Sequence, residues 1–160
     1  MREISVKTKD NKIKINTNDI IEILNLKSDF ESIVDISDTL NQKKIFAYDC
    51  ILDREVLDLE LLEEIVNELH KRNDVNASVR LDDIVQYIQE LSDEVETDIE
   101  DEYNIENITC HFNLYNVETT TNEFRFVFLI SFDEKVSQSI VNLSEIIGKR
   151  QLLGESKYYN

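Results

Sequence analysis

The sequence predicts an α+β fold: a single domain in which four to five helices pack on one face of a mainly antiparallel sheet, built from two hairpins plus a further strand. Three observations predict this fold. Residues 124–132 alternate between an aromatic face and a second face, as a strand does. Paired strand patterns lie near both ends of the chain, and helix patterns lie between them. Single strands do not alternate with helices, so the pattern is not that of a doubly wound sheet.

Residues 3–8 and 12–16 are expected to form the first hairpin, because apolar and lysine side chains alternate along both segments. One face holds Ile4, Val6, Ile13 and Ile15, and the other holds Lys7, Lys9, Lys12 and Lys14. Asp10 and Asn11 suit a two-residue turn, since both tolerate positive φ. The lysine face is typical of a solvated sheet surface, and contact with an anion is the alternative.

Two short helices and a strand are expected next. Residues 18–26 have an Asn and an Asp at their start, either of which can cap a helix. Ser28 followed by Glu31 fits a capping box, which predicts a second helix over residues 29–35. A turn then leads to residues 44–50, whose alternation predicts a strand.

Two longer helices are expected in the middle of the chain, over residues 58–72 and 82–102. The second has an apolar stripe that should face the core. The stripe consists of Ile84, Ile88, Leu91, Val95 and Ile99. Asp98 and Glu102 fall close to this stripe, so the helix either frays near Thr97 or is solvated all round at its end.

The second hairpin is expected over residues 105–117 and 124–132, and its second strand anchors the fold. Large apolar side chains at every second position predict that one face of this strand is buried. They are Phe124, Phe126, Phe128, Ile130 and Phe132. A final amphipathic helix should begin at Asp133 and end at Gly148, because glycine commonly follows the last helical residue.

The domain is expected to span residues 1–154, and residues 155–160 are expected to form a flexible C-terminal tail. The chain has no proline and two glycines, so it has no segment with the composition of a linker. Cys50 and Cys110 fall at inward positions of predicted strands, which favours free thiols in the core and a reducing cytoplasm. No apolar run is long enough to span a bilayer.

The chain carries a formal net charge of −17, from 34 acidic and 17 basic residues. Residues 53–106 hold 19 acids and 4 bases, a net charge of −15, and residues 90–106 hold nine acids and no base. This charge opposes binding to nucleic-acid phosphates and to anionic membranes, since both need Lys and Arg. We therefore expect a basic protein partner, with no direct nucleic-acid binding and no membrane binding.

The expected partner-binding residues lie in the second central helix and at its end. They are Glu90, Asp93, Glu94, Glu96, Asp98, Glu100, Asp101, Glu102 and Tyr103. Acids recur about once per 3 Å along such a helix, close to the ~3.4 Å between phosphates of a DNA strand. An aromatic anchor should accompany them, and the candidates are Tyr103, Tyr115, Tyr158 and Tyr159. The alternatives are acids that serve solubility alone or that hold a cation.

No catalytic, metal or cofactor motif is found. An EF-hand starting at Asp98 lacks its turn glycine and its last glutamate. Cys110 and His111 would point to opposite faces of a strand, which argues against a zinc site. Residues 133–135 resemble the acids and lysine of a metal-dependent nuclease, but they are better explained as the start of a helix. We expect no enzymatic activity and no cofactor.

In size, acidity and its acidic helices around residues 58–72 and 82–102, the chain resembles the small acidic proteins by which bacteriophages inhibit host defence nucleases, of the anti-CRISPR and anti-restriction type. The resemblance implies an inhibitor that acts in the host cytoplasm. It would dock on the basic, nucleic-acid-facing surface of a nuclease such as a CRISPR effector, with DNA mimicry as one means. The alternative is a non-catalytic structural or regulatory module of a phage or bacterial complex.

Overall fold

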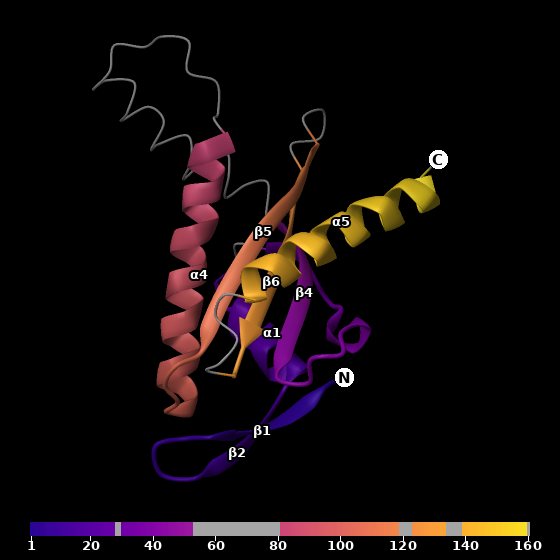
Figure 1. Ribbon diagram of the computed structural model, residues 1–160. Helices are drawn as coiled ribbons and strands as arrows, with labels where there is room; N and C mark the ends of the chain where they lie inside the picture. Colours follow the sequence, from indigo (N-terminus) through magenta and orange to yellow (C-terminus); the bar gives the residue numbers. More distant parts are fainter. Residues whose placement is uncertain (28–29, 53–80, 119–122, 134–138, 160) are drawn as a thin grey trace, which may run out of the picture.

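The computed structural model describes residues 1–27, 30–52, 81–118, 123–133 and 139–159 (Figure 1). In chain order, the elements are β1 (Glu3–Lys7), β2 (Lys12–Asn16), α1 (Thr17–Asn25), β3 (Phe30–Asp35), the short 3-10 helix η1 (Ser37–Thr39), β4 (Ile45–Leu52), α4 (Leu81–Tyr103), β5 (Thr109–Glu118), β6 (Glu123–Ser131) and α5 (Ser139–Tyr159). The class is α+β, as expected, but the architecture differs from the expected one in its sheets, its helices and the faces that are covered.

The strands form two sheets, and the expectation of one sheet is wrong. β3, β4, β6 and β5 form a four-stranded antiparallel sheet in that order, while β1 and β2 pair separately. The strand at residues 44–50 and the second hairpin are confirmed as β4 and as β5 with β6. Residues 29–35 were expected to be helical, but β3 begins at Phe30, and its Ile33 pairs with Cys50 of β4. Pairing with a buried strand outweighs a local capping signal, because intrinsic propensities are weak.

The expectation of four to five helices is wrong for the described residues, which contain three α-helices and η1. The expected helix over residues 58–72 lies outside the described residues. α1 begins slightly earlier than expected, with Asn16 as its N-cap. The side chain of Asn16 accepts from the amide of Asp19, and the Asp19 carboxylate accepts from the amide of Asn16. This reciprocal capping box satisfies two backbone donors and fixes the start of the helix.

The four-stranded sheet is buried on both faces, and the expectation that helices cover one face is wrong. On one face, α1, α4 and the β1–β2 hairpin pack against the expected aromatic face of β6. On the other face, α5 crosses the sheet (Figure 1), where Val127 and Leu129 pack with Ile140 and Ile147. β6 lies in the interior of the sheet, and the described side chains of both its faces are therefore apolar apart from Arg125 and Ser131.

α4 runs unbroken from Leu81 to Tyr103, so it does not fray at Thr97. It ends where Asn104 adopts a φ of 52°, a left-handed conformation that asparagine tolerates better than most residues. The amide of Ile105 then donates to the carbonyl of Glu100 at 3.1 Å. The helix therefore keeps its acidic C-terminal half in regular helical geometry.

α5 continues through Gly148, and the expectation that this glycine ends the helix is wrong. A Cβ atom at this position would lie 2.5 Å from Nδ2 of Asn113 and 3.1 Å from Cβ of Tyr115. Gly148 is therefore needed for the close approach of α5 to β5, not for a change of direction. The backbone of residues 155–159 continues the same helix. The expected flexibility of the tail at residues 155–160 stays a prediction.

The β1–β2 hairpin has the expected faces, with its strand lysines exposed. Its turn differs from the expected one. Lys7 pairs with Lys12, so four residues connect the strands in place of two. The hydroxyl of Thr8 accepts from the amides of Asp10 and Asn11. Neither of these two residues has a positive φ, because the threonine side chain satisfies the turn amides without a primed turn.

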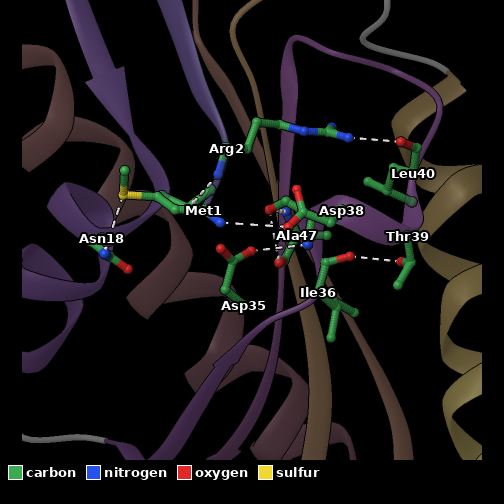
Figure 2. A network of polar contacts seen from close by, with 11 residues as sticks. Met1, Arg2, Asn18, Asp35, Ile36, Asp38, Thr39, Leu40 and Ala47 are labelled. Carbon is green, nitrogen blue, oxygen red and sulfur yellow. Dashed lines mark hydrogen bonds and ion pairs between the residues drawn. The ribbon is translucent and has the colours of Figure 1, made fainter.

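The N-terminal residues tie the small sheet to the large one (Figure 2). The guanidinium of Arg2 donates to the backbone carbonyl of Leu40, as Figure 2 shows. It also donates to the backbone carbonyls of Gln42 and Ile45. The α-amino group lies 3.5 Å from the carboxylate of Asp38. A guanidinium presents several donors in one plane, so a single side chain can hold two carbonyls of the segment before β4 and that of the first residue of β4.

Candidate protein-binding surface on helix α4

The acids of α4 lie on two flanks of the helix, because its remaining face is packed in the core. The buried side chains are Ile88, Leu91, Val95 and Ile99. Side chains three or four positions apart share a side of a helix, which separates the acids into two rows. The outer flank consists of Glu90, Glu94, Asp98, Asp101 and Glu102. The sheet-side flank consists of Asp93, Glu96 and Glu100.

All five acids of the outer flank are exposed. The ammonium of Lys27, just after α1, lies 2.7 Å from Asp98 and 3.4 Å from Glu94. The hydrogen bond to Asp98 raises the pKa of Lys27, and burial opposes this more weakly. Within the described part of the chain, no other salt bridge reaches the outer flank. Asp98 thus lies beside the apolar stripe and shares Lys27 as a partner with Glu94, whereas no salt bridge from the described residues reaches Glu90, Asp101 or Glu102.

The sheet-side flank faces β5. Asp93 is exposed, whereas Glu96 and Glu100 are half-buried. Burial, followed by repulsion from Glu100 and Asp93, raises the pKa of Glu96, and hydrogen bonding with the Cys110 backbone acts in the opposite direction. Burial and the same three acids raise the pKa of the Cys110 thiol. This flank therefore offers a partner fewer free carboxylates than the outer flank does.

The end of α4 is fastened to the turn of the β1–β2 hairpin. The ammonium of Lys9 lies 3.0 Å from the carboxylate of Glu106, and the Lys9 amide donates to the carbonyl of Asn104. Nδ2 of Asn104 donates to the carboxylate of Asp10 at 3.2 Å. These contacts place a basic turn beside the end of the acidic helix. Contact between the lysine face of the hairpin and an anion stays a prediction.

Of the four expected aromatic anchors, the structure describes the side chains of two, Tyr103 and Tyr115, and both are half-buried. Tyr103 is half-buried and packs against the core, where burial and neighbouring acids raise its pKa to about 12. The hydroxyl of Tyr115 donates to Asp49 at 2.7 Å, on the side of the sheet that α5 covers. The side chains of Tyr158 and Tyr159 lie outside the described residues. The role of these tyrosines in binding a partner stays a prediction.

A groove with both apolar and charged lining residues adjoins the outer flank, and sequence reasoning missed it. The groove lies between α1 and α4 and has a volume of about 420 Å³. Its lining residues are Ile23, Leu26, Lys27, Asp98, Asp101 and Glu102. The side chain of Leu26 is 84% exposed. A leucine followed by a lysine at a helix end is too common a pattern to mark a groove, because the second wall comes from a distant helix.

The described residues hold no group of three or more His, Cys, Asp or Glu side chains that could bind a metal ion. Cys50 and Cys110 are free, buried thiols, as expected for core residues. Burial lowers the pKa of His111, which Glu145 partly opposes. Among the helices of the described ranges, none is long and apolar enough to span a bilayer.

Comparisons with protein-family models, with curated proteins and with solved structures find no match to this chain. Function must therefore be inferred from the charge, the exposure and the shape of the surface on α4.

Proposed function

We propose that this protein is a non-enzymatic inhibitor, of the anti-restriction or anti-CRISPR kind, that docks through the outer flank of α4 on the basic, nucleic-acid-facing surface of a nuclease. One observation carries the proposal: five exposed acids form one helix flank, and among the described residues the single base that pairs with them, Lys27, contacts two. Like charges at this spacing destabilise a helix, and a basic partner would relieve that repulsion. The inhibitor acts in the cytoplasm, where its two free thiols stay reduced.

The spacing of the charges supports a nucleic-acid-binding surface as the complement. At a rise of ~1.5 Å per residue, residues 90–102 span about 18 Å, so the five acids of the outer flank recur roughly every 4.5 Å. A DNA strand carries one phosphate per ~3.4 Å. Lysines and arginines that bind a row of phosphates can also bind such a row of carboxylates. A protein seated there would exclude DNA.

The charges act on association rate and specificity more than on affinity. An exposed ion pair contributes about 0–1 kcal/mol, because water and salt screen it. Complementary surface potentials nevertheless speed encounter and exclude acidic partners. Binding should therefore weaken as salt rises, and it should weaken less steeply once the outer flank is neutralised.

The test compares two triple variants with the same net charge. The flank variant carries Glu90→Gln, Glu94→Gln and Asp101→Asn. The control variant carries Glu3→Gln, Glu31→Gln and Glu145→Gln, which are exposed acids on other elements. Each protein is immobilised and exposed to cytoplasmic extract of the native host at stepped NaCl concentrations, and the captured proteins are identified.

The wild type and the control variant are expected to capture the same basic protein, which salt and added duplex DNA release. The flank variant is expected to lose most of this capture. A partner that the flank variant captures equally well, or that DNA does not displace, would overturn the proposal.

A second candidate function is favoured by the exposed apolar side chains of α5. Ile146 is 63% exposed and Leu153 is 65% exposed, on a helix that covers the sheet with its other residues. Exposed apolar surface of this kind marks protein contacts, so the chain could be a structural or regulatory module of a larger complex. This reading predicts a partner that resists salt and DNA and that is lost when Ile146 and Leu153 become serine.

A further inference from the structure

The groove between α1 and α4 combines an apolar wall with an acidic one. Ile23 and Leu26 line it from α1 and Asp98, Asp101 and Glu102 line it from α4, with Lys27 beside Leu26. Leu26 has the highest exposed fraction, 84%, of the exposed large apolar side chains in the described part of the chain. The groove therefore offers apolar contact area directly beside carboxylates.

Two helices end at this groove. Ile23 lies in the last turn of α1 and Leu26 is its C-cap, while Asp101 and Glu102 lie in the last turn of α4. Neither helix has a basic residue in its last turn, and Lys27, which follows the C-cap of α1, pairs with Asp98 and Glu94 of α4. The C-terminus of a helix carries partial negative charge, which a cation there would balance. The backbone and the carboxylates thus favour the same kind of ligand, a cation.

Lys27 shows how a cation is held on this flank. Its ammonium lies between Asp98 and Glu94, at 2.7 Å and 3.4 Å, and so bridges one turn of α4. The next turn carries Asp101 and Glu102. No salt bridge reaches either of these two acids from the residues that the structure describes. Within the described residues, the flank therefore has one pair of carboxylates that contacts a cation, Glu94 and Asp98, and one pair that does not, Asp101 and Glu102.

We propose that this groove receives an arginine side chain from a basic segment of the partner protein and is the anchor point of the docking surface. The proposal rests on the proposed function. A guanidinium can donate to Asp101 and Glu102 together, and it is less strongly hydrated than an ammonium. The aliphatic part of the same side chain can lie on Leu26. Arginine packed in this way is typical of the few contacts that dominate an interface.

The experiment uses the full chain labelled with ¹⁵N and two short peptides, one alternating arginine with glycine and one alternating lysine with glycine. Titration at constant salt gives the Kd and the backbone amides that shift. The arginine peptide is expected to bind more tightly, with the largest shifts at residues 23–27 and 98–103.

Two variants test the walls of the groove separately. Leu26→Ser alters no charge and is expected to weaken binding of the arginine peptide by about fivefold, because it removes the apolar surface on which the arginine stem lies. Its control is Val34→Ser, because Val34 is 53% exposed on β3. Asp101→Asn combined with Glu102→Gln tests the acidic wall. Its control is Glu3→Gln combined with Glu31→Gln, which has the same net charge.

The outcomes separate this inference from the proposed function. If the arginine peptide binds α4 but the Kd is unchanged in both groove variants, the anchor assignment is wrong and the outer flank remains a binding surface. If the lysine peptide binds as tightly as the arginine peptide, the assignment of arginine is wrong. If neither peptide binds the wild type, the docking surface itself is wrong.

Discussion

Glu96 shows what a single side chain does at the boundary between α4 and the sheet. β5 is an edge strand, and hydrogen bonding between the Cys110 backbone and the Glu96 carboxylate occupies part of that edge. Burial and the neighbouring acids Glu100 and Asp93 nevertheless oppose the charged form. A charged side chain at an edge strand hinders pairing with strands of other molecules. This benefit explains why Glu96 is present although its ionised form lowers stability.

Replacing Glu96 with Gln is expected to raise the melting temperature at neutral pH and to change it less near pH 4. The pKa of Glu96 in the folded protein is raised above its ordinary value of 4.5. Protonated Glu96 therefore favours folding below pH 4.5, and this contribution is lost as the pH rises through the pKa of the folded state. The ionised side chain therefore costs stability at neutral pH, which Gln avoids. Because Glu96 is half-exposed, the gain is below about 1 kcal/mol.

Differential scanning calorimetry at the two pH values checks this expectation. The control is Glu90→Gln, because Glu90 is exposed on the same helix and should gain less. A larger gain near pH 4 than at neutral pH would contradict the assigned sign.

At the scale of elements, the sequence predicts those elements whose pattern is long and regular. β6 and α4 carry an apolar repeat over 9 and 23 residues, and both were expected within a few residues of their true bounds. β3 has 6 residues, which is too short for periodicity to decide between helix and strand, so pairing with β4 decides it. Gly148 was read as a helix end because sequence cannot show that a strand lies against it.

The candidate site also has one part that the sequence predicts and one part that it does not. The acids of α4 could be placed on a helix from sequence, because their spacing along one element is enough. The groove could not be placed, because it depends on tertiary packing of α1 against α4. Lys27 and Glu94 are 67 positions apart in sequence, and nothing local indicates their contact.

Gly148→Ala is expected to destabilise the fold by about 1 kcal/mol, although alanine is the better helix former. The added Cβ would lie 2.5 Å from Nδ2 of Asn113 and 3.1 Å from Cβ of Tyr115. The Asn113 amide donates to the carbonyl of Ser144 at 3.2 Å, so moving it away loses that hydrogen bond. Overpacking costs about 1–3 kcal/mol, against about 1 kcal/mol gained from helix propensity. Urea unfolding measures the difference.

Gly154→Ala is the matched control, because it lies in the same helix and a Cβ there would meet no atom within 4 Å. It is expected to stabilise the protein by up to about 1 kcal/mol. Equal stabilisation by both substitutions would mean that α5 does not approach β5 as closely as the structure shows.

At the scale of the whole molecule, charge is distributed unevenly. α4 carries ten acids and no base along its length, whereas the strands of the β1–β2 hairpin carry exposed lysines. The two regions meet through Lys9 and Glu106, next to the C-terminal end of α4. With a net charge of −17, repulsion opposes the compact state and acts over distances that salt controls. Binding of a basic partner and addition of salt should therefore both reduce this repulsion and stabilise the folded state.

Raising NaCl from about 0.01 M to about 0.1 M is expected to raise the melting temperature, because the Debye length falls from about 30 Å to about 10 Å. The flank variant with Glu90, Glu94 and Asp101 neutralised is expected to melt higher at low salt and to respond less to added salt. The control variant with Glu3, Glu31 and Glu145 neutralised has the same net charge but leaves the row on α4 intact. Its melting temperature is expected to rise with added salt more than that of the flank variant does. The reason is that it keeps the closely spaced acids of α4, and charges close together repel most strongly.

Thermal unfolding of the three proteins across this salt range tests the predicted salt dependence of the melting temperature. If the melting temperatures of the two variants change equally with salt, net charge alone determines the repulsion, and the outer flank contributes no more than other acids do. If the wild type melts lower as salt rises, attractive pairs such as Lys27 with Asp98 outweigh the repulsion. The flank would then already be balanced within the chain, and a basic partner would gain nothing by neutralising it.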